Sequence, residues 1–183
     1  MPARWLDRLL ILLFAFASYI AFVYEPMFLY FTQCGWDGLH IGAGGPCEQT
    51  GIGRAWLGYL QVEPIYANAP VWIRLVNEFD VFLFGWFYVL SVWVFLSGRQ
   101  TRTWYKYVGT FVSGMMTYSM VLYLTWETLS VHDSGSNLKA VYMYNGLWLF
   151  IFALLMVRLH LYRNASADGK PVIADTARGL RGA

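Results

Sequence analysis

The chain has 183 residues, of which 58% are hydrophobic and only 13% are charged. A soluble domain usually carries about 25% charged residues, so this composition excludes an ordinary soluble protein and indicates an integral membrane protein of one domain. The formal net charge of +2 is too small to indicate a nucleic-acid partner.

The first apolar segment runs from about Leu9 to Phe31 and is longer than the apolar part of a signal peptide. A transmembrane helix needs roughly 20 mostly apolar residues, so we expect this segment to be retained as a membrane span. A long connection from Thr32 to Pro70 follows it. The first part is rich in glycine and predicts an irregular loop, and the second part, AWLGYLQVEPIYANAP, predicts a short amphipathic or re-entrant segment.

Two cysteines, Cys34 and Cys47, both lie in the glycine-rich part of this connection. A disulfide would close the loop if it faces an oxidising compartment, and the alternative is two unpaired thiols. The spacing matches neither a CxxC motif nor a zinc site, so we expect no metal centre.

Three further segments are long and apolar enough to cross a membrane, at about Val71 to Ser97, Tyr107 to Trp126 and Ala140 to Leu161. The sequence therefore predicts an all-α, polytopic membrane protein, a four-transmembrane-helix bundle with a long outer loop between helices 1 and 2. We expect residues 1–163 to form the transmembrane domain and residues 164–183 to form a flexible cytosolic tail.

The 13 Lys and Arg residues are distributed unevenly between the two sides of this predicted bundle. Only Arg54, Arg74 and Lys139 fall on the side of the long loop, and the other ten fall on the side of the two termini. The positive-inside rule then places both termini in the cytosol, in a bacterial inner membrane or in the endoplasmic reticulum.

Acidic residues lie within or at the ends of three predicted spans, at Glu25, Glu78, Asp80 and Glu127, and Asn145 lies at a similar depth in the fourth span. A charge near the bilayer centre costs roughly 3 kcal/mol, so such groups usually face the bundle interior and mark a site. The alternative is that Glu25 and Glu127 reach the headgroup region. Glu78 and Asp80 are two positions apart and point in different directions, and we expect Glu78 to face inward and Asp80 to face the interface or a partner.

Aromatic residues accompany these acids. Trp148 follows Asn145 by three positions and shares its face, and Tyr123 precedes Glu127 by four and could hydrogen-bond it. Trp86 could belong either to a ligand site or to a helix contact made close by Gly85. Carboxyl groups in an apolar pocket have raised pKa values and aromatic faces stabilise cations, so the pattern favours a carbocation-type reaction or a cationic amphiphile.

Four segments resemble the EXPERA family of membrane proteins, in its emopamil-binding (sterol Δ8–Δ7 isomerase) branch: IAFVYEPMFLYF, WLGYLQVEPIYANAPVWIRLVNEFD, VLYLTWE and YNGLW. The resemblance implies a lipid pocket between the helices, with Glu25 and Glu78 as the catalytic acid–base pair. It also implies that Asn145 supports these acids by hydrogen bonding and that Trp148 faces the cation. Taking the residue pattern and the resemblance together, we predict as substrate-binding residues Asn145, Trp148, Glu127, Tyr123, Tyr66 and Trp86. One position departs from the family, because Ala21 stands where the isomerase has a His.

Three functions follow as hypotheses. The first is a cofactor-independent isomerase that shifts a double bond in a sterol, terpenoid or similar lipid by protonation and deprotonation. The second is a non-catalytic binder of sterols or cationic amphiphiles, like the sigma-2 receptor branch of the family. The third is an accessory subunit of a membrane complex. In the first two, the expected partner is a hydrophobic small molecule or lipid, and a homodimer or a larger complex is left open.

Overall fold

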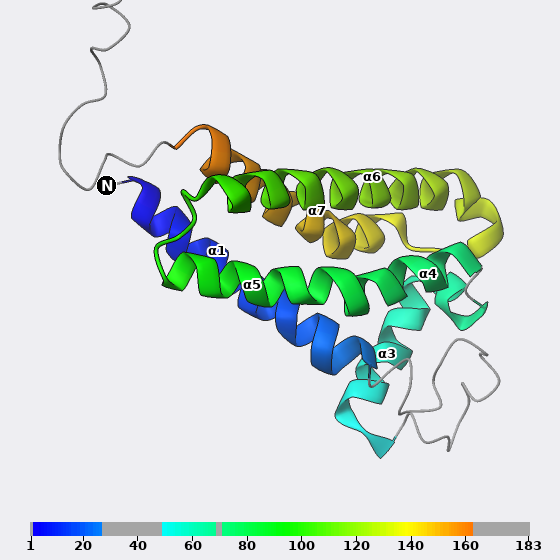
Figure 1. Cartoon of the computed structure of the whole chain (residues 1–183). Coiled ribbons are helices and arrows are strands. Elements are labelled where there is room, and N and C mark those ends of the chain that lie inside the picture. Colours follow the sequence, from blue (N-terminus) through cyan, green and yellow to red (C-terminus); the bar gives the residue numbers. More distant parts are fainter. Residues whose placement is uncertain (1, 27–48, 69–70, 163–183) are drawn as a thin grey trace, which may run out of the picture.

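The computed structural model describes residues 2–26, 49–68 and 71–162, and within these ranges every regular element is a helix (Figure 1). Four helical segments are long and apolar enough to cross a membrane: Arg4–Tyr24, Val71–Leu96, Thr103–Ser130 and Leu138–His160. The prediction of a polytopic, all-helical membrane bundle is therefore confirmed. Both cysteines, most of the glycine-rich loop and the predicted tail lie outside the described residues.

Two of the four spans contain a turn of π-helix, at the end of the first span and in the middle of the second. The first span consists of α1 (Pro2–Tyr19) and the π-helix η1 (Ile20–Tyr24). The second consists of α4 (Val71–Phe79), the π-helix η4 (Asp80–Phe84) and α5 (Gly85–Leu96). The third and fourth are the uninterrupted helices α6 (Thr103–Ser134) and α7 (Leu138–His160). π-turns are rare in α-helices as a whole, but those that do occur are often found at functional sites.

Helix α1 packs against both α5 and α7, and α7 packs against α6 (Figure 1). The bundle interior is filled largely by aromatic rings, and Phe14 is the centre of this cluster. Its ring centroid lies 5.9 Å from that of Phe87 and 6.1 Å from that of Phe152, both in edge-to-face geometry. Such rings bury a large apolar area each, so this cluster is the main apolar support of the bundle.

At the end of the bundle where α1 begins and α7 ends, a buried ion pair joins the spans. Arg158 donates to both carboxylate oxygens of Asp7, and the bond to Oδ2 measures 3.2 Å. Gln100, in the turn between α5 and α6, donates to the same carboxylate at 3.1 Å. A bidentate Arg–carboxylate pair fixes orientation as well as charge, so these three side chains set the position of α1 relative to α5, α6 and α7.

The opposite end of the bundle is covered by α3 (Gly51–Val62) and the 3₁₀-helix η3 (Pro64–Asn68). The predicted short amphipathic segment is therefore helical. Thr50 caps α3 by accepting a hydrogen bond from the Gly53 amide at 2.9 Å. The Asn137 amide donates to the Val62 carbonyl at 2.8 Å, so the end of α3 is joined to the turn between α6 and α7.

The two π-helices contact each other across the α1–α5 interface, and Gly85 permits this close approach. A Cβ at Gly85 would lie 3.0 Å from the Phe22 ring and 3.2 Å from the Ala21 Cβ. No side chain other than hydrogen fits there without displacing Phe22. The contact brings together the two points at which the helices carry buried acids.

Candidate functional site

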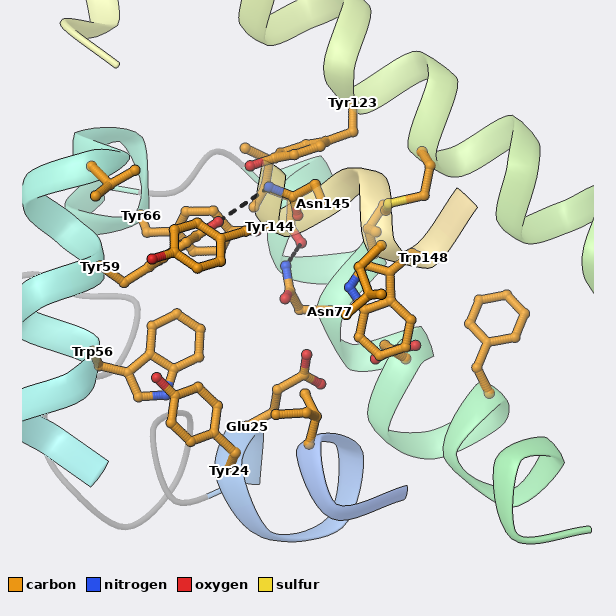
Figure 2. Close-up of a pocket in the computed structure, with 18 of the residues that line it drawn as sticks. Tyr24, Glu25, Trp56, Tyr59, Tyr66, Asn77, Tyr123, Tyr144, Asn145 and Trp148 are labelled. Carbon is orange, nitrogen blue, oxygen red and sulfur yellow. Dashed lines mark hydrogen bonds between the residues drawn. The ribbon is translucent and has the colours of Figure 1, made fainter. Parts of the chain in front are cut away.

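A cavity of about 560 Å³ lies between the spans and the covering helix α3, at the end of the bundle where η1 ends and α4 begins. Figure 2 shows labelled side chains from the end of the first span and from α3, η3, α4, α6 and α7 directed toward it. Most of the wall is aromatic or aliphatic. Its polar groups belong to Tyr24, Glu25, Trp56, Tyr59, Tyr66, Asn77, Asp80, Tyr123, Tyr144, Asn145 and Trp148.

One pair of acids, Glu25 and Asp80, lies where the two π-helices meet. Both residues are buried and line the cavity, and their carboxyl groups interact electrostatically. Tyr88 donates a hydrogen bond to Asp80, and the Tyr88 ring stacks on Trp148 with the centroids 5.7 Å apart. Among the described residues Glu25 Oε2 has no hydrogen-bond partner, so this oxygen is available to a group in the cavity.

A second polar group lies on the α3 side of the cavity. The Tyr59 hydroxyl donates to the Glu63 carboxylate and accepts a hydrogen bond of 3.3 Å from the Asn145 side-chain amide. The same Asn145 nitrogen donates to the Val141 carbonyl at 3.0 Å. Tyr59 and Asn145 line the cavity, whereas Glu63 lies behind them and is completely buried. The three residues thus form a short hydrogen-bonded chain that leads from the cavity wall to a buried acid.

Burial on the α3 side of the cavity favours the protonated forms of Glu63, Tyr59 and Tyr66. Burial raises the pKa of Glu63 to about 8, the hydrogen bond from Tyr59 acts in the opposite direction, and the Glu127 carboxyl raises it further. Burial also raises the pKa values of Tyr59 and Tyr66 well above 10. Both phenols therefore stay protonated at any physiological pH and can act as hydrogen-bond donors.

Two more polar groups are directed into the cavity from α4 and α6. Asn77 donates one amide hydrogen to the Ile73 carbonyl at 2.9 Å and lies on the cavity wall (Figure 2). The Tyr123 hydroxyl is buried and has no hydrogen-bond partner among the described residues. Because a buried hydroxyl without a partner is costly, Tyr123 is a candidate ligand-binding donor.

Five of the eight residues predicted from the sequence for a ligand site line the cavity: Glu25, Tyr66, Tyr123, Asn145 and Trp148. Glu127 does not line it, although the side chain is completely buried. The predicted hydrogen bond between Tyr123 and Glu127 is not formed.

The predicted orientation of Glu78 and Asp80 was wrong. Asp80 is buried and lines the cavity, and Glu78 is half-buried and does not. The inward stripe of this span consists of Ile73, Val76, Asn77 and Asp80, which is the i, i+3, i+4, i+7 spacing of one helix face. Glu78 lies off that stripe.

Trp86 was also placed wrongly as a ligand-binding residue. Its side chain is 65% exposed and packs edge-to-face on Phe22, on the outside of the α1–α5 contact. Trp86 was expected to belong either to a ligand site or to a helix contact next to Gly85, and the structure supports the helix contact.

Two cavity-lining residues, Asn77 and Tyr59, were not predicted as site residues, and neither was Glu63, which is hydrogen-bonded to Tyr59 behind the cavity wall. Glu63 lies outside the four spans, where an acid needs no special explanation. The feature of the sequence that could have indicated a buried Glu63 is its position at the end of an apolar helical segment, directly before Pro64. Among the described residues, no group of three or more His, Cys, Asp or Glu side chains is arranged to hold a metal ion.

Fold and site together define a polytopic helical membrane protein with a polar, aromatic-walled cavity between its spans. The chain is similar to the fluoride-specific ion channel FluC of Pyrococcus furiosus, with 34% identity over 113 residues that make up 61% of this chain and 81% of that protein. The chain belongs to the FluC family of fluoride-specific ion channels. No family model matches it, and no solved structure matches it.

This family membership overturns the predicted place in the EXPERA family. The predicted sterol isomerase, the alternative of a sterol or amphiphile binder or an accessory subunit, and the expected hydrophobic ligand are corrected with it. The misleading features were acids at helix ends and aromatic residues at helical spacing. Any membrane bundle with a polar cavity near one end needs residues of these types, so they do not distinguish one family from another.

Proposed function

We propose that this protein is a fluoride channel. The observation that carries the proposal is the 34% identity to the FluC channel of Pyrococcus furiosus over 81% of that protein's length. The cavity gives this proposal a physical basis, because it lies among the membrane spans and its wall offers groups that an anion requires.

Fluoride is a small anion that accepts strong hydrogen bonds from O–H and N–H groups. The cavity wall supplies phenol hydroxyls from Tyr59, Tyr66 and Tyr123 and side-chain amides from Asn77 and Asn145. None of the described residues that line it is a Lys or Arg. Neutral donors suit conduction, because an ion must bind well enough to enter and weakly enough to leave.

Toward the termini, the interior of the bundle is filled by buried apolar side chains. Phe16, Phe84, Met116 and Trp148 are among the residues that line the cavity, and Phe84, Met116 and Trp148 also belong to, or pack against, the apolar core. Beyond the cavity lies the ring cluster around Phe14, whose members are completely or almost completely buried. A hydrophobic constriction can gate an ion pathway by excluding water, so we assign the gate to the Phe14 cluster.

We further propose that both termini face the cytosol and that the cavity end faces the opposite side of the membrane. Ten of the 13 basic residues fall on the side of the termini, and the positive-inside rule supports this orientation. A bacterial inner membrane or an endoplasmic reticulum membrane fits equally.

Fluoride efflux from liposomes tests the proposed function. Vesicles loaded with potassium fluoride and containing the purified full-length protein are diluted into fluoride-free buffer with a potassium ionophore, and a fluoride electrode follows release. We expect release above that of protein-free vesicles, and little release of chloride from chloride-loaded vesicles. Tyr123→Phe should slow it, and Tyr118→Phe, which changes a tyrosine that is 70% exposed, should not. Release equal to that of protein-free vesicles would refute the proposal.

A further inference from the structure

We propose that Glu63 is a proton-binding site that controls the affinity of the cavity for an anion through the hydroxyl of Tyr59, so that fluoride and a proton bind together. This inference rests on the proposed function, and it adds a second ligand, the proton, and a residue that lies outside the four spans.

The geometry begins with the single hydrogen of the Tyr59 hydroxyl. Tyr59 lines the cavity, but its hydrogen is donated to Glu63, and its oxygen accepts from Asn145. A phenol has one hydrogen to donate. While Glu63 is ionised, Tyr59 therefore offers no donor to the cavity, and one Asn145 amide hydrogen is occupied as well.

Protonation of Glu63 reverses this polarity. A neutral carboxyl carries its own hydrogen and can donate it to the Tyr59 oxygen. The Tyr59 hydroxyl then rotates and donates its hydrogen into the cavity. One proton is taken from water by the carboxylate, and no other covalent bond is made or broken. The anion gains one donor and no longer faces the negative charge of Glu63.

The charges around Glu63 favour the protonated form. Glu63 and Glu127 are both completely buried, and the salt bridge found in the described residues, Asp7–Arg158, lies at the other end of the bundle. Neither carboxyl forms a salt bridge with a described residue, and two carboxylates held close together in a low-dielectric interior repel each other strongly. The pair therefore retains a proton into the neutral range.

The groups that act on Glu63 come from four elements. Tyr59 of α3 donates to it, Tyr66 of η3 and Glu127 of α6 interact with it electrostatically, and Asn145 of α7 lies next to it beyond Tyr59. Consistent with this surrounding, the pKa of Glu63 is raised to about 8, chiefly by burial. Proton exchange therefore falls within an accessible pH range.

Linkage fixes the expected pH dependence. If the anion binds well only when Glu63 is protonated, fluoride affinity is constant well below pH 8 and falls about tenfold for each pH unit above it. By reciprocity, bound fluoride raises the affinity of Glu63 for its proton by the same factor.

The test is fluoride efflux with equal pH on both sides of the membrane, from pH 6 to pH 10, at a fluoride concentration low enough for the rate to follow affinity. The native chain should show the loss above pH 8. Glu63→Gln, which keeps a neutral partner for Tyr59, should give a pH-independent rate. Tyr59→Phe, which removes the responding hydroxyl but leaves the Glu63 carboxyl, should show a much smaller loss than the native chain. Glu78→Gln and Tyr118→Phe are the matched controls, because both residues lie outside the cavity lining, and both should keep the native profile.

The outcomes separate the two proposals. A native rate that does not change with pH, or a Glu63→Gln profile equal to the native one, overturns the inference and leaves the channel function standing. No fluoride release at any pH overturns both. If Glu63→Gln cannot be purified as folded protein, the efflux profile of Tyr59→Phe tests the inference instead. A loss of efflux rate above pH 8 in Tyr59→Phe as large as that of the native chain would refute control by Glu63 through the Tyr59 hydroxyl.

Discussion

Replacing Glu63 by Gln should stabilise the folded protein at alkaline pH. The folded state holds the Glu63 pKa at about 8, against an ordinary value of 4.5. Between these two pH values the folded chain binds more protons than the unfolded chain, so the free energy of unfolding falls as pH rises through this window. Below pH 4.5 and above pH 8 this contribution no longer changes.

The size of the effect follows from the pKa difference. Each pKa unit corresponds to about 1.4 kcal/mol, so raising the pKa of Glu63 from 4.5 to about 8 costs on the order of 5 kcal/mol once the pH exceeds 8. For a chain of this length, 1 kcal/mol shifts the unfolding temperature by roughly 2 to 4 °C. The native protein should therefore lose on the order of 10 °C between pH 5 and pH 9.

The assay is thermal unfolding of the detergent-solubilised protein, followed by helicity at pH 5, 7 and 9. Glu63→Gln keeps an acceptor for the Tyr59 hydroxyl and carries no charge, so its unfolding temperature should change much less over this range. At pH 9 the variant should be the more stable of the two. Parallel pH profiles for the native protein and the variant would refute the assignment of a buried, proton-holding carboxyl at this position.

Three further predictions concern other contacts of the bundle. Asp7→Asn leaves the Arg158 charge buried without its counter-ion and should lower the free energy of unfolding by about 3 to 5 kcal/mol in denaturant titrations, whereas pairing it with Arg158→Gln should restore part of the loss. Gly85→Ala should destabilise by roughly 1 to 3 kcal/mol, since its Cβ would press on the Phe22 ring, and Gly114→Ala, where no atom lies within 4 Å, should be neutral in the same thermal assay. Glu127→Gln should move the pH midpoint of fluoride efflux to lower pH, because the Glu127 carboxyl raises the pKa of Glu63, and an unmoved or higher midpoint would contradict this coupling.

The four spans could be predicted from the sequence because membrane insertion depends on the length and hydrophobicity of single segments, and both are local properties. The depth of the acids was local information too, and Glu25, Asn145 and Trp148 do line one cavity. The sequence was a poorer guide to which face of its helix each acid occupies. The stripe that includes Asn77 and Asp80 continues into a π-helix, and no pattern in the sequence announces that interruption.

Residues outside the spans were the main omission. Glu63 becomes part of the site only because α3 folds back over the end of the bundle, and the bond from the Asn137 amide to the Val62 carbonyl holds it near α6 and α7. That contact joins segments more than 70 positions apart in sequence, and neither segment is distinctive on its own. Assignment of the family failed for a related reason, since the motifs used for it reflect the needs of any polar cavity in a membrane bundle.

The two ends of the bundle handle buried negative charge in different ways. At one end, Asp7 is neutralised by Arg158 and receives a further bond from Gln100, which produces a fixed joint between spans. At the other end, Glu25, Asp80, Glu63 and Glu127 are buried, and no described residue forms a salt bridge with any of them. Protons are the charges small enough to neutralise such carboxyls without filling the space beside them. An anion that enters this cavity therefore meets a wall whose charge depends on the protons it holds, and this dependence is the physical reason to expect fluoride and proton binding to be linked.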